Sequence, residues 1–179
     1  IPPLRPNGRL DHPDALFTHT AARDRAIAET TARAHMEGRP VLLVVASATQ
    51  AAQLGERLRA ASVRCSVLEA RSGEVNAAVL ERAGSPGAVT IAIRGVDRGI
   101  AIPLGRGGAV LGGLCVIGTA RPGIELADQL VRGWAGQRGA PGATRFFLSL
   151  DDTASFGSEA AASLPRRWRG RPSRPSSGL

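Results

Sequence analysis

The sequence predicts an α/β fold in which helices cover both faces of a doubly wound parallel sheet. Apolar runs of strand length alternate along the chain with helical patterns, which is typical of this class. The run at 41–46, VLLVVA, is apolar throughout, as expected of a strand that is buried on both faces. Aromatic residues make up only 3% of the chain and Tyr is absent, so Val, Leu, Ile and Ala must form the core.

The first part of the chain should hold an extended segment and one helix. Residues 1–17 are rich in proline, which interrupts helices, and we expect them to form an extended linker. Thr18 or Thr20 can cap a helix that runs to about Glu37. Gly38 should end that helix, because glycine readily takes the left-handed conformation found after helices.

The middle of the chain continues the alternation. After the strand at 41–46, Ser47 or Thr49 should cap a helix over about 50–61. A short strand is expected at 65–68. The next helix should cover 74–83, with a glycine following its last residue.

The last part of the chain contains the clearest strand signals. The runs VTIAI (89–93), LCVIG (114–118) and RFFLSL (145–150) predict strands, and a helix is expected from about 124 to 131. Residues 153–179 are reduced to Ala, Ser, Gly, Pro and Arg with few apolar side chains. We expect a disordered basic tail there, because such a composition cannot bury enough apolar surface to fold.

Composition excludes several kinds of chemistry. All 23 basic residues are Arg, so the chain has no P-loop lysine and no lysine that could form a Schiff base. Cys65 and Cys115 lie in apolar runs and are expected to be buried, unpaired thiols. With three scattered His, they show no metal-ligand spacing. No run of 18 apolar residues and no signal peptide is present, and a chain that begins at Ile1 is expected to be a piece of a longer polypeptide.

Six segments match one known family in order and in plausible spacing. They are IPPLRPNGRLDHPD (1–14), GRPVLLVVAS (38–47), VLEAR (67–71), AGSPGAVTIA (83–92), LGGLCVIGTAR (111–121) and RFFLSLDD (145–152). Together they resemble the second motor domain of SecA, the ATPase that drives preproteins through the bacterial Sec channel. The Pro-Pro pair near the start is closest to the accessory SecA of actinobacteria.

The resemblance implies a RecA-like fold of the P-loop NTPase superfamily, in the half that lacks the P-loop. Residues 18–152 would be the second nucleotide-binding motor domain, between the 1–17 linker and the 153–179 tail. ATP with Mg²⁺ would bind only together with a P-loop-bearing motor domain, and no cofactor would bind to this chain alone. The family's other partners are a SecY-type channel and a preprotein, at the inner face of the plasma membrane. The net charge of +8 permits contact with an anionic membrane.

The loop after VTIAI departs from the family pattern, TNMAGRGTDI. Here the chain reads IRGVDRGIAI, in which Arg98, Gly99 and Ile102 match. Ala101 stands where the family has an acid that helps to organise the nucleotide site. A methyl group can neither accept a hydrogen bond nor orient a cation, so we expect this part of the site to be impaired.

The second motif, DNQLRGRSGRQGDPG in the family, departs as well. Arg132, Gly133 and Gly136 match it, but Trp134 and Gln137 stand where the family has its second and third arginines. Arginines of this kind neutralise charge on the transferred phosphoryl group and contribute about 10³- to 10⁵-fold to the rate. The family's nucleotide-binding residues therefore carry over only to Arg98, Gly99, Arg132, Gly133 and Gly136, and no catalytic residue is intact.

Structural roles for these residues stay open beside the functional ones. Arg98 could pair with a neighbouring acid instead of a phosphate, and Arg132 could pair with Asp128, one helical turn away. Arg138 could partly substitute for a lost arginine. Trp134 is expected to pack against the domain.

Four hypotheses of function remain. The leading one is a half of a SecA-type motor for preprotein translocation that is inactive alone. A second is a degenerate module that docks on a motor partner and regulates it. A third is a non-functional remnant whose tail follows a shift of reading frame. A nucleic-acid helicase is the weakest, because the sequence shows no aromatic platform on which bases could stack.

Overall fold

The computed structural model of the 179-residue chain describes residues 8–71, 74–93, 101–120 and 125–151. The predicted tail at 153–179 lies outside these ranges. The helices are α1 (Thr20–Met36), α2 (Ala48–Ala60), α3 (Ala77–Ala83), α4 (Glu125–Gly133) and the 3₁₀ turn η1 (Gln137–Gly139). The strands are β1 (Arg9–Asp11), β2 (Ala15–Phe17), β3 (Val41–Val45), β4 (Ser66–Leu68), β5 (Ala70–Arg71), β6 (Glu74–Val75), β7 (Val89–Ile93), β8 (Leu114–Gly118) and β9 (Gly142–Ser149).

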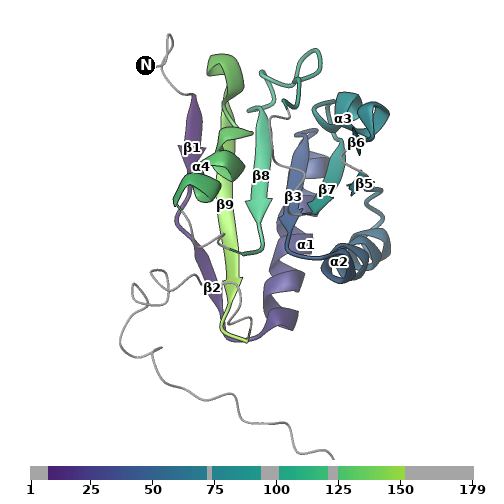
Figure 1. Ribbon diagram of the computed structural model, residues 1–179, viewed down its shortest axis with the longest axis vertical. Coiled ribbons are helices and arrows are strands. Elements are labelled where there is room, and N and C mark those ends of the chain that lie inside the picture. Colours follow the sequence, from purple (N-terminus) through teal and green to yellow (C-terminus); the bar gives the residue numbers. More distant parts are fainter. Residues whose placement is uncertain (1–7, 72–73, 94–100, 121–124, 152–179) are drawn as a thin grey trace, which may run out of the picture.

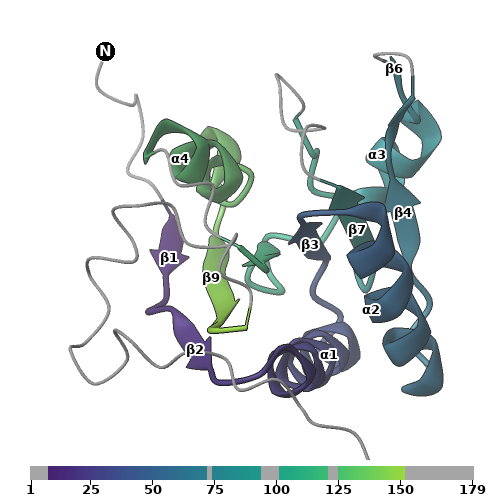
Figure 2. The same ribbon diagram turned by 60° about the horizontal axis from the view of Figure 1, so that its bottom comes forward.

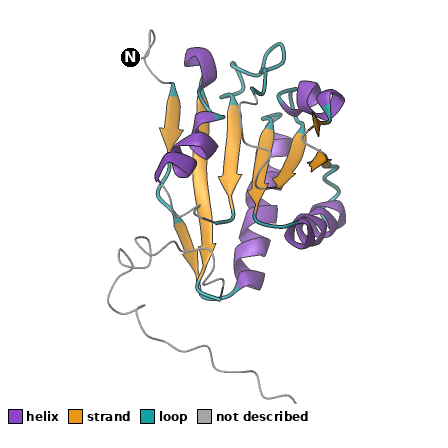
Figure 3. Ribbon diagram, viewed as in Figure 1, coloured by secondary structure: helices purple, strands orange, loops and turns teal. Residues whose placement is uncertain are grey.

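Seven strands form one parallel sheet in the order β1-β9-β8-β3-β7-β4, with β2 also paired to β9 (Figures 1 and 3). All five residues of β3 are buried, because β7 and β8 flank it and helices lie above and below. The predicted α/β doubly wound fold is therefore confirmed. The strands β5 and β6 form a separate antiparallel pair.

Helices lie on both faces of the sheet, as Figure 2 shows, and a separate hydrophobic core lies on each face. The helices α1 and α2 cover one face, where Ile27, Leu54 and Leu43 belong to one buried cluster. The helices α3 and α4 lie on the other face, where Trp134 and Phe146 belong to the core. Because side chains alternate along a strand, the fully apolar runs of the sequence supply both cores at once.

The proline-rich lead-in forms part of the sheet. Both β1 and β2 pair in parallel with β9, one beside its beginning and the other beside its end. The backbone N–H of His12 donates to the carbonyl of Thr144 at 2.8 Å between the two pairings. Residues 9–17 thus make an interrupted edge strand, which the proline content of the sequence did not suggest.

Helix starts are only partly as predicted. Ser47, one of the two predicted alternatives, caps α2: its side chain accepts a hydrogen bond from the N–H of Gln50. The prediction of a threonine cap for α1 is wrong, because His19 holds that position and makes no cap through its side chain. The carboxylate of Asp151, from the other end of the domain, accepts from the N–H of Thr20 at 3.3 Å instead.

The prediction of a helix from Glu74 is wrong by three residues. Glu74 and Val75 form β6, and α3 begins only at Ala77. The side chain of Asn76 accepts from the N–H of Val79, which fixes the start of the helix there.

The two thiols are half-buried rather than buried. Burial raises the pKa of both Cys65 and Cys115, although Arg59 and Arg39 respectively act in the opposite direction. Both cysteines therefore stay protonated and weakly nucleophilic near neutral pH.

Candidate functional site on the α4 face

The segment that carries the second predicted motif is fixed to the sheet by apolar side chains. Val131, Trp134 and Ala135 are 5%, 4% and 2% exposed and belong to the same core as β8 and β9. The prediction that Trp134 packs against the domain is confirmed. Its ring lies among the apolar side chains of the core, at a position where we expected the family pattern to have an arginine.

Arg132 lies on α4 above the beginning of β9, with its side chain 14% exposed. Its guanidinium donates to the hydroxyl of Thr144 at 2.9 Å and lies 3.3 Å from a carboxylate oxygen of Asp11. It also lies over the ring of Phe146, 5.0 Å from the centroid. These contacts hold the side chain against the sheet. The predicted pairing with Asp128 stays a prediction.

Asp11 is the centre of this polar group. One of its carboxylate oxygens accepts from Thr144 at 2.6 Å and lies 2.8 Å from Nε of Arg9. Burial raises the pKa of Asp11, but the hydrogen bonds from Thr144 and Arg9 and the charges of Arg9 and Arg132 outweigh it and hold the pKa below the ordinary value. Asp11 is thus an anion that balances two arginines.

The two predicted glycines of the motif differ in what they provide. Gly136 adopts φ +77°, a conformation that favours glycine, and lets the chain turn from α4 into η1. Gly133 is the last residue of α4, and an added Cβ would meet nothing within 4 Å. Only Gly136 is therefore required by the local backbone.

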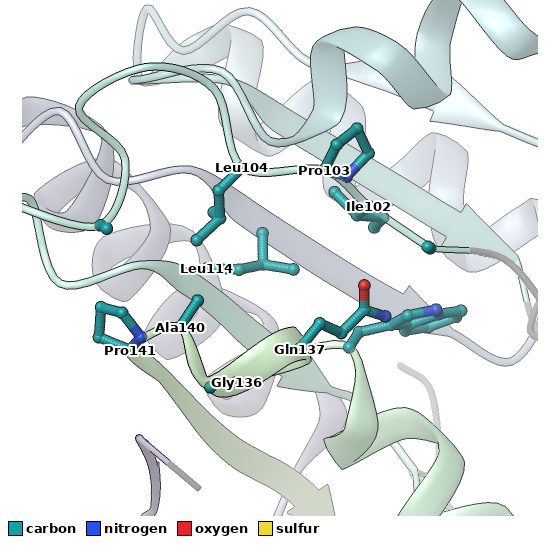
Figure 4. Close-up of a pocket in the computed structure, with 12 residues that line it drawn as sticks. Ile102, Pro103, Leu104, Leu114, Gly136, Gln137, Ala140 and Pro141 are labelled. Atoms are coloured by element: carbon teal, nitrogen blue, oxygen red, sulfur yellow. The ribbon is translucent and has the colours of Figure 1, made fainter. Parts of the chain in front are cut away.

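An apolar cavity of about 480 Å³ lies beside this segment. Figure 4 shows Ile102, Pro103 and Leu104 on one side, Gln137 and Pro141 on the other, and Leu114 between them. The remaining lining residues are Ala101, Ala109, Trp134, Gly136, Gly139 and Ala140. The structure thus brings the ends of both predicted motifs together around one cavity, and none of these twelve lining residues carries a charge.

This lining does not fit a triphosphate by itself. Phosphate oxygens are held by arginine, lysine, backbone N–H groups or a metal ion, whereas the side-chain donors here are the amide of Gln137 and the indole of Trp134. Arg98 and Gly99, the other two predicted nucleotide-binding residues, lie outside the described residues. Ala101 is exposed and is one of the residues that line the cavity.

Sequence reasoning missed a buried polar cluster at the carboxyl ends of β3 and β8. Arg23, 2% exposed, pairs with Asp24 at 2.9 Å and points at the carbonyl of Thr119. The hydroxyl of Thr119 donates to Gln50, whose amide oxygen also accepts from the backbone of the β3–α2 turn. Two sequence features could have indicated this cluster: an adjacent Arg and Asp near the start of a helix, and a threonine directly after a strand.

Asp24 also lines a second, polar cavity of about 320 Å³ between α1 and α2. Across the described ranges, His, Cys, Asp and Glu side chains do not gather in groups of three or more that could hold a metal ion. None of the helices in those ranges has the length and hydropathy that a membrane-spanning segment needs.

The SecA P-loop domain family matches this chain over residues 6–110 and 106–169. The chain belongs to this family. The chain is also 42% identical over 151 residues to the protein translocase subunit SecA of Caldicellulosiruptor saccharolyticus. That alignment covers 84% of this chain but only 18% of the relative, so the chain spans about a fifth of the length of the SecA subunit it matches.

Among solved structures, the chain is similar to the E. coli DEAD-box protein SrmB, in a crystal structure with the regulator of ribonuclease activity A. The TM-score is 0.65 with 15% sequence identity, and the match covers 94% of this chain and 98% of the other. At that identity the likeness shows the fold, which is the RecA-like fold that the resemblance to SecA implied.

Proposed function

We propose that this chain is the second nucleotide-binding half of a SecA-type motor for preprotein translocation, and that it does not hydrolyse ATP alone. The observation that carries the proposal is the family match combined with an uncharged cavity where the two motifs meet. The absence of lysine supports it, since a Walker P-loop requires one.

ATP with Mg²⁺ would bind only where a P-loop-bearing motor domain faces this half. In that arrangement we assign the contacts from this side to Arg98, Gly99, Arg132, Gly133 and Gly136. The bound Mg²⁺ would neutralise charge on the phosphates. The loss of charge at Ala101, Trp134 and Gln137 would leave the transferred phosphoryl group less stabilised than in the family pattern, which is the sense in which we regard the motifs as degenerate.

The further partners follow from the same proposal. A SecY-type channel and a preprotein would be engaged by the complete motor, at the cytoplasmic face of the plasma membrane. We also propose kinship with the accessory SecA of actinobacteria, which the Pro-Pro pair near the start of the sequence supports.

A direct test is to mix this chain with the separately prepared P-loop half of the Caldicellulosiruptor SecA and to measure association by calorimetry. We expect a complex that binds a fluorescent ATP analogue, whereas the chain alone binds none. Glu29→Gln, an exposed change on α1, should bind like the unaltered chain. Binding of the analogue by the chain alone, or no association between the halves, would contradict the proposal.

A docking module without turnover is the second candidate. The engagement of Arg132 with Asp11 and Thr144 favours it, because an arginine held against the sheet is not directed at a phosphate. The same mixture distinguishes the two candidates. A module would associate with the P-loop half but leave its affinity for the ATP analogue unchanged.

A further inference from the structure

The lead-in strand reaches the α4 face through one carboxylate. In the parallel pairing of β1 with β9, Asp11 stands opposite Thr144. Its carboxylate meets the hydroxyl of Thr144 at 2.6 Å, Arg9 at 2.8 Å and Arg132 at 3.3 Å. Figures 1 and 2 both show α4 lying over β1 and the neighbouring part of β9. A residue near the start of the chain thus fixes a side chain on α4, the last described α-helix.

We propose that β1 is a latch that positions Arg132 through Asp11. Displacement of β1 from the edge of the sheet would release this arginine. Asp11 is a positioning residue in this proposal, since it would affect a bound nucleotide only through Arg132. The Asp11 latch is defined here as Asp11 together with Arg9, Thr144 and Arg132.

The latch is built from elements that open easily. β1 has three residues and lies at the edge of the sheet, and short edge elements with few buried contacts are the first to detach in local unfolding. The Asp11 side chain is 39% exposed and that of Arg132 is 14% exposed. Water can therefore solvate both charges when they separate, and the latch does not trap a charge in the core.

Release would change what Arg132 can do. With Asp11 in place, its guanidinium is balanced by an anion and rests on the ring of Phe146. Without Asp11 the guanidinium keeps its charge and its forked geometry, which suit a phosphate oxygen. This consequence for a bound nucleotide rests on the proposed function. The mechanical link between β1 and Arg132 does not.

The first test measures the reactivity of Arg132 in the full chain carrying Asp11→Asn. Phenylglyoxal modification of Arg132 is followed by mass spectrometry, and that of the buried Arg23 reports any global unfolding. We expect the Arg132 rate to rise about three- to fivefold, as the loss of one ion pair predicts, with the Arg23 rate unchanged. Glu29→Gln should alter neither rate. If the modification rate of Arg132 did not change, or rose equally at Arg23, the latch proposal would be wrong.

The second test uses the reciprocity of coupled sites. If Asp11 holds Arg132, then Arg132→Gln must loosen β1. We expect hydrogen exchange at the amides of residues 9–12 to accelerate about three- to fivefold, while exchange in β3 stays the same. Unchanged exchange in 9–12 would refute the coupling. Neither test uses nucleotide or a partner, so failure here leaves the proposed function standing.

Discussion

At the scale of single residues, Trp134 and Gln137 occupy different surroundings although both replace an arginine of the family pattern. Trp134 is 4% exposed and belongs to the core, so Trp134→Arg would bury a charge among apolar groups. We expect it to lower the free energy of unfolding by more than about 3 kcal/mol. Gln137 lines the cavity and is half-buried, so Gln137→Arg should cost less than about 1 kcal/mol.

Urea unfolding of the two variants beside the unaltered chain checks this contrast. A tolerated arginine at 134 would show that the ring can leave the core, contrary to the packing described. A severe loss at 137 would show that the cavity cannot admit a longer side chain.

The charge of Asp11 gives stability a pH dependence. Its folded pKa lies below the ordinary value of 3.8. A lowered pKa contributes stability that is present above the unfolded pKa and is lost as the pH falls through the folded one. Because the group is exposed, Asp11→Asn should cost only about 0.5–1 kcal/mol at pH 7. Urea unfolding at pH 7 and pH 3 should show this difference shrink at pH 3. An equal difference at both values would assign the effect to packing.

The sequence indicated that Trp134 packs against the domain but not which groups surround Arg132. The expectation that Trp134 packs against the domain is confirmed, and the structure adds that its ring lies in the core. Asp11 was not recognised as the anion beside Arg132, because the contact joins two segments far apart in the sequence. Helical periodicity suggests Asp128 instead, one turn before Arg132.

At the scale of elements, the junction of β8 and β9 depends on close backbone approach at Gly113. Gly113 and Gly107 both have φ in the left-handed region, +71° and +83°. A Cβ at Gly113 would clash with the carbonyl of Pro141, directly before β9, whereas one at Gly107 would meet nothing within 4 Å.

Comparing Gly113→Ala with Gly107→Ala therefore separates the cost of the clash with Pro141 from the cost of the left-handed backbone. Gly107→Ala should cost about 1–2 kcal/mol, the strain of the left-handed conformation alone. Gly113→Ala should cost at least about 2 kcal/mol more, because backbone must shift to relieve the clash. Thermal unfolding measures both, and equal losses would mean that the two strands can separate without penalty.

The central strands were predictable and the edges of the sheet were not. Burial on both faces leaves the fully apolar runs of β3, β7 and β8, which periodicity detects. The edge strands β1 and β2 have three residues each and are partly exposed. Their pairing depends on β9, which lies far from them in the sequence. No local pattern could have indicated it.

At the scale of the whole molecule, the fold persists where sequence identity is low. The match to a DEAD-box protein at 15% identity and a TM-score of 0.65 shares the scaffold, and a scaffold alone does not define an activity. The match to SecA over 84% of the chain at 42% identity is what defines the family. We propose that this scaffold is retained while charges of the second motif are altered.

ATP turnover by a chimera tests this claim most directly. In the chimera, this chain replaces the matching region of the Caldicellulosiruptor SecA, and the intact SecA is the control. The chimera lacks the family's arginines at Trp134 and Gln137, so we expect turnover at least about 10³-fold below that of the intact SecA. Gln137→Arg in the chimera should recover part of that loss. A folded chimera that hydrolyses ATP as fast as the intact SecA would contradict the account.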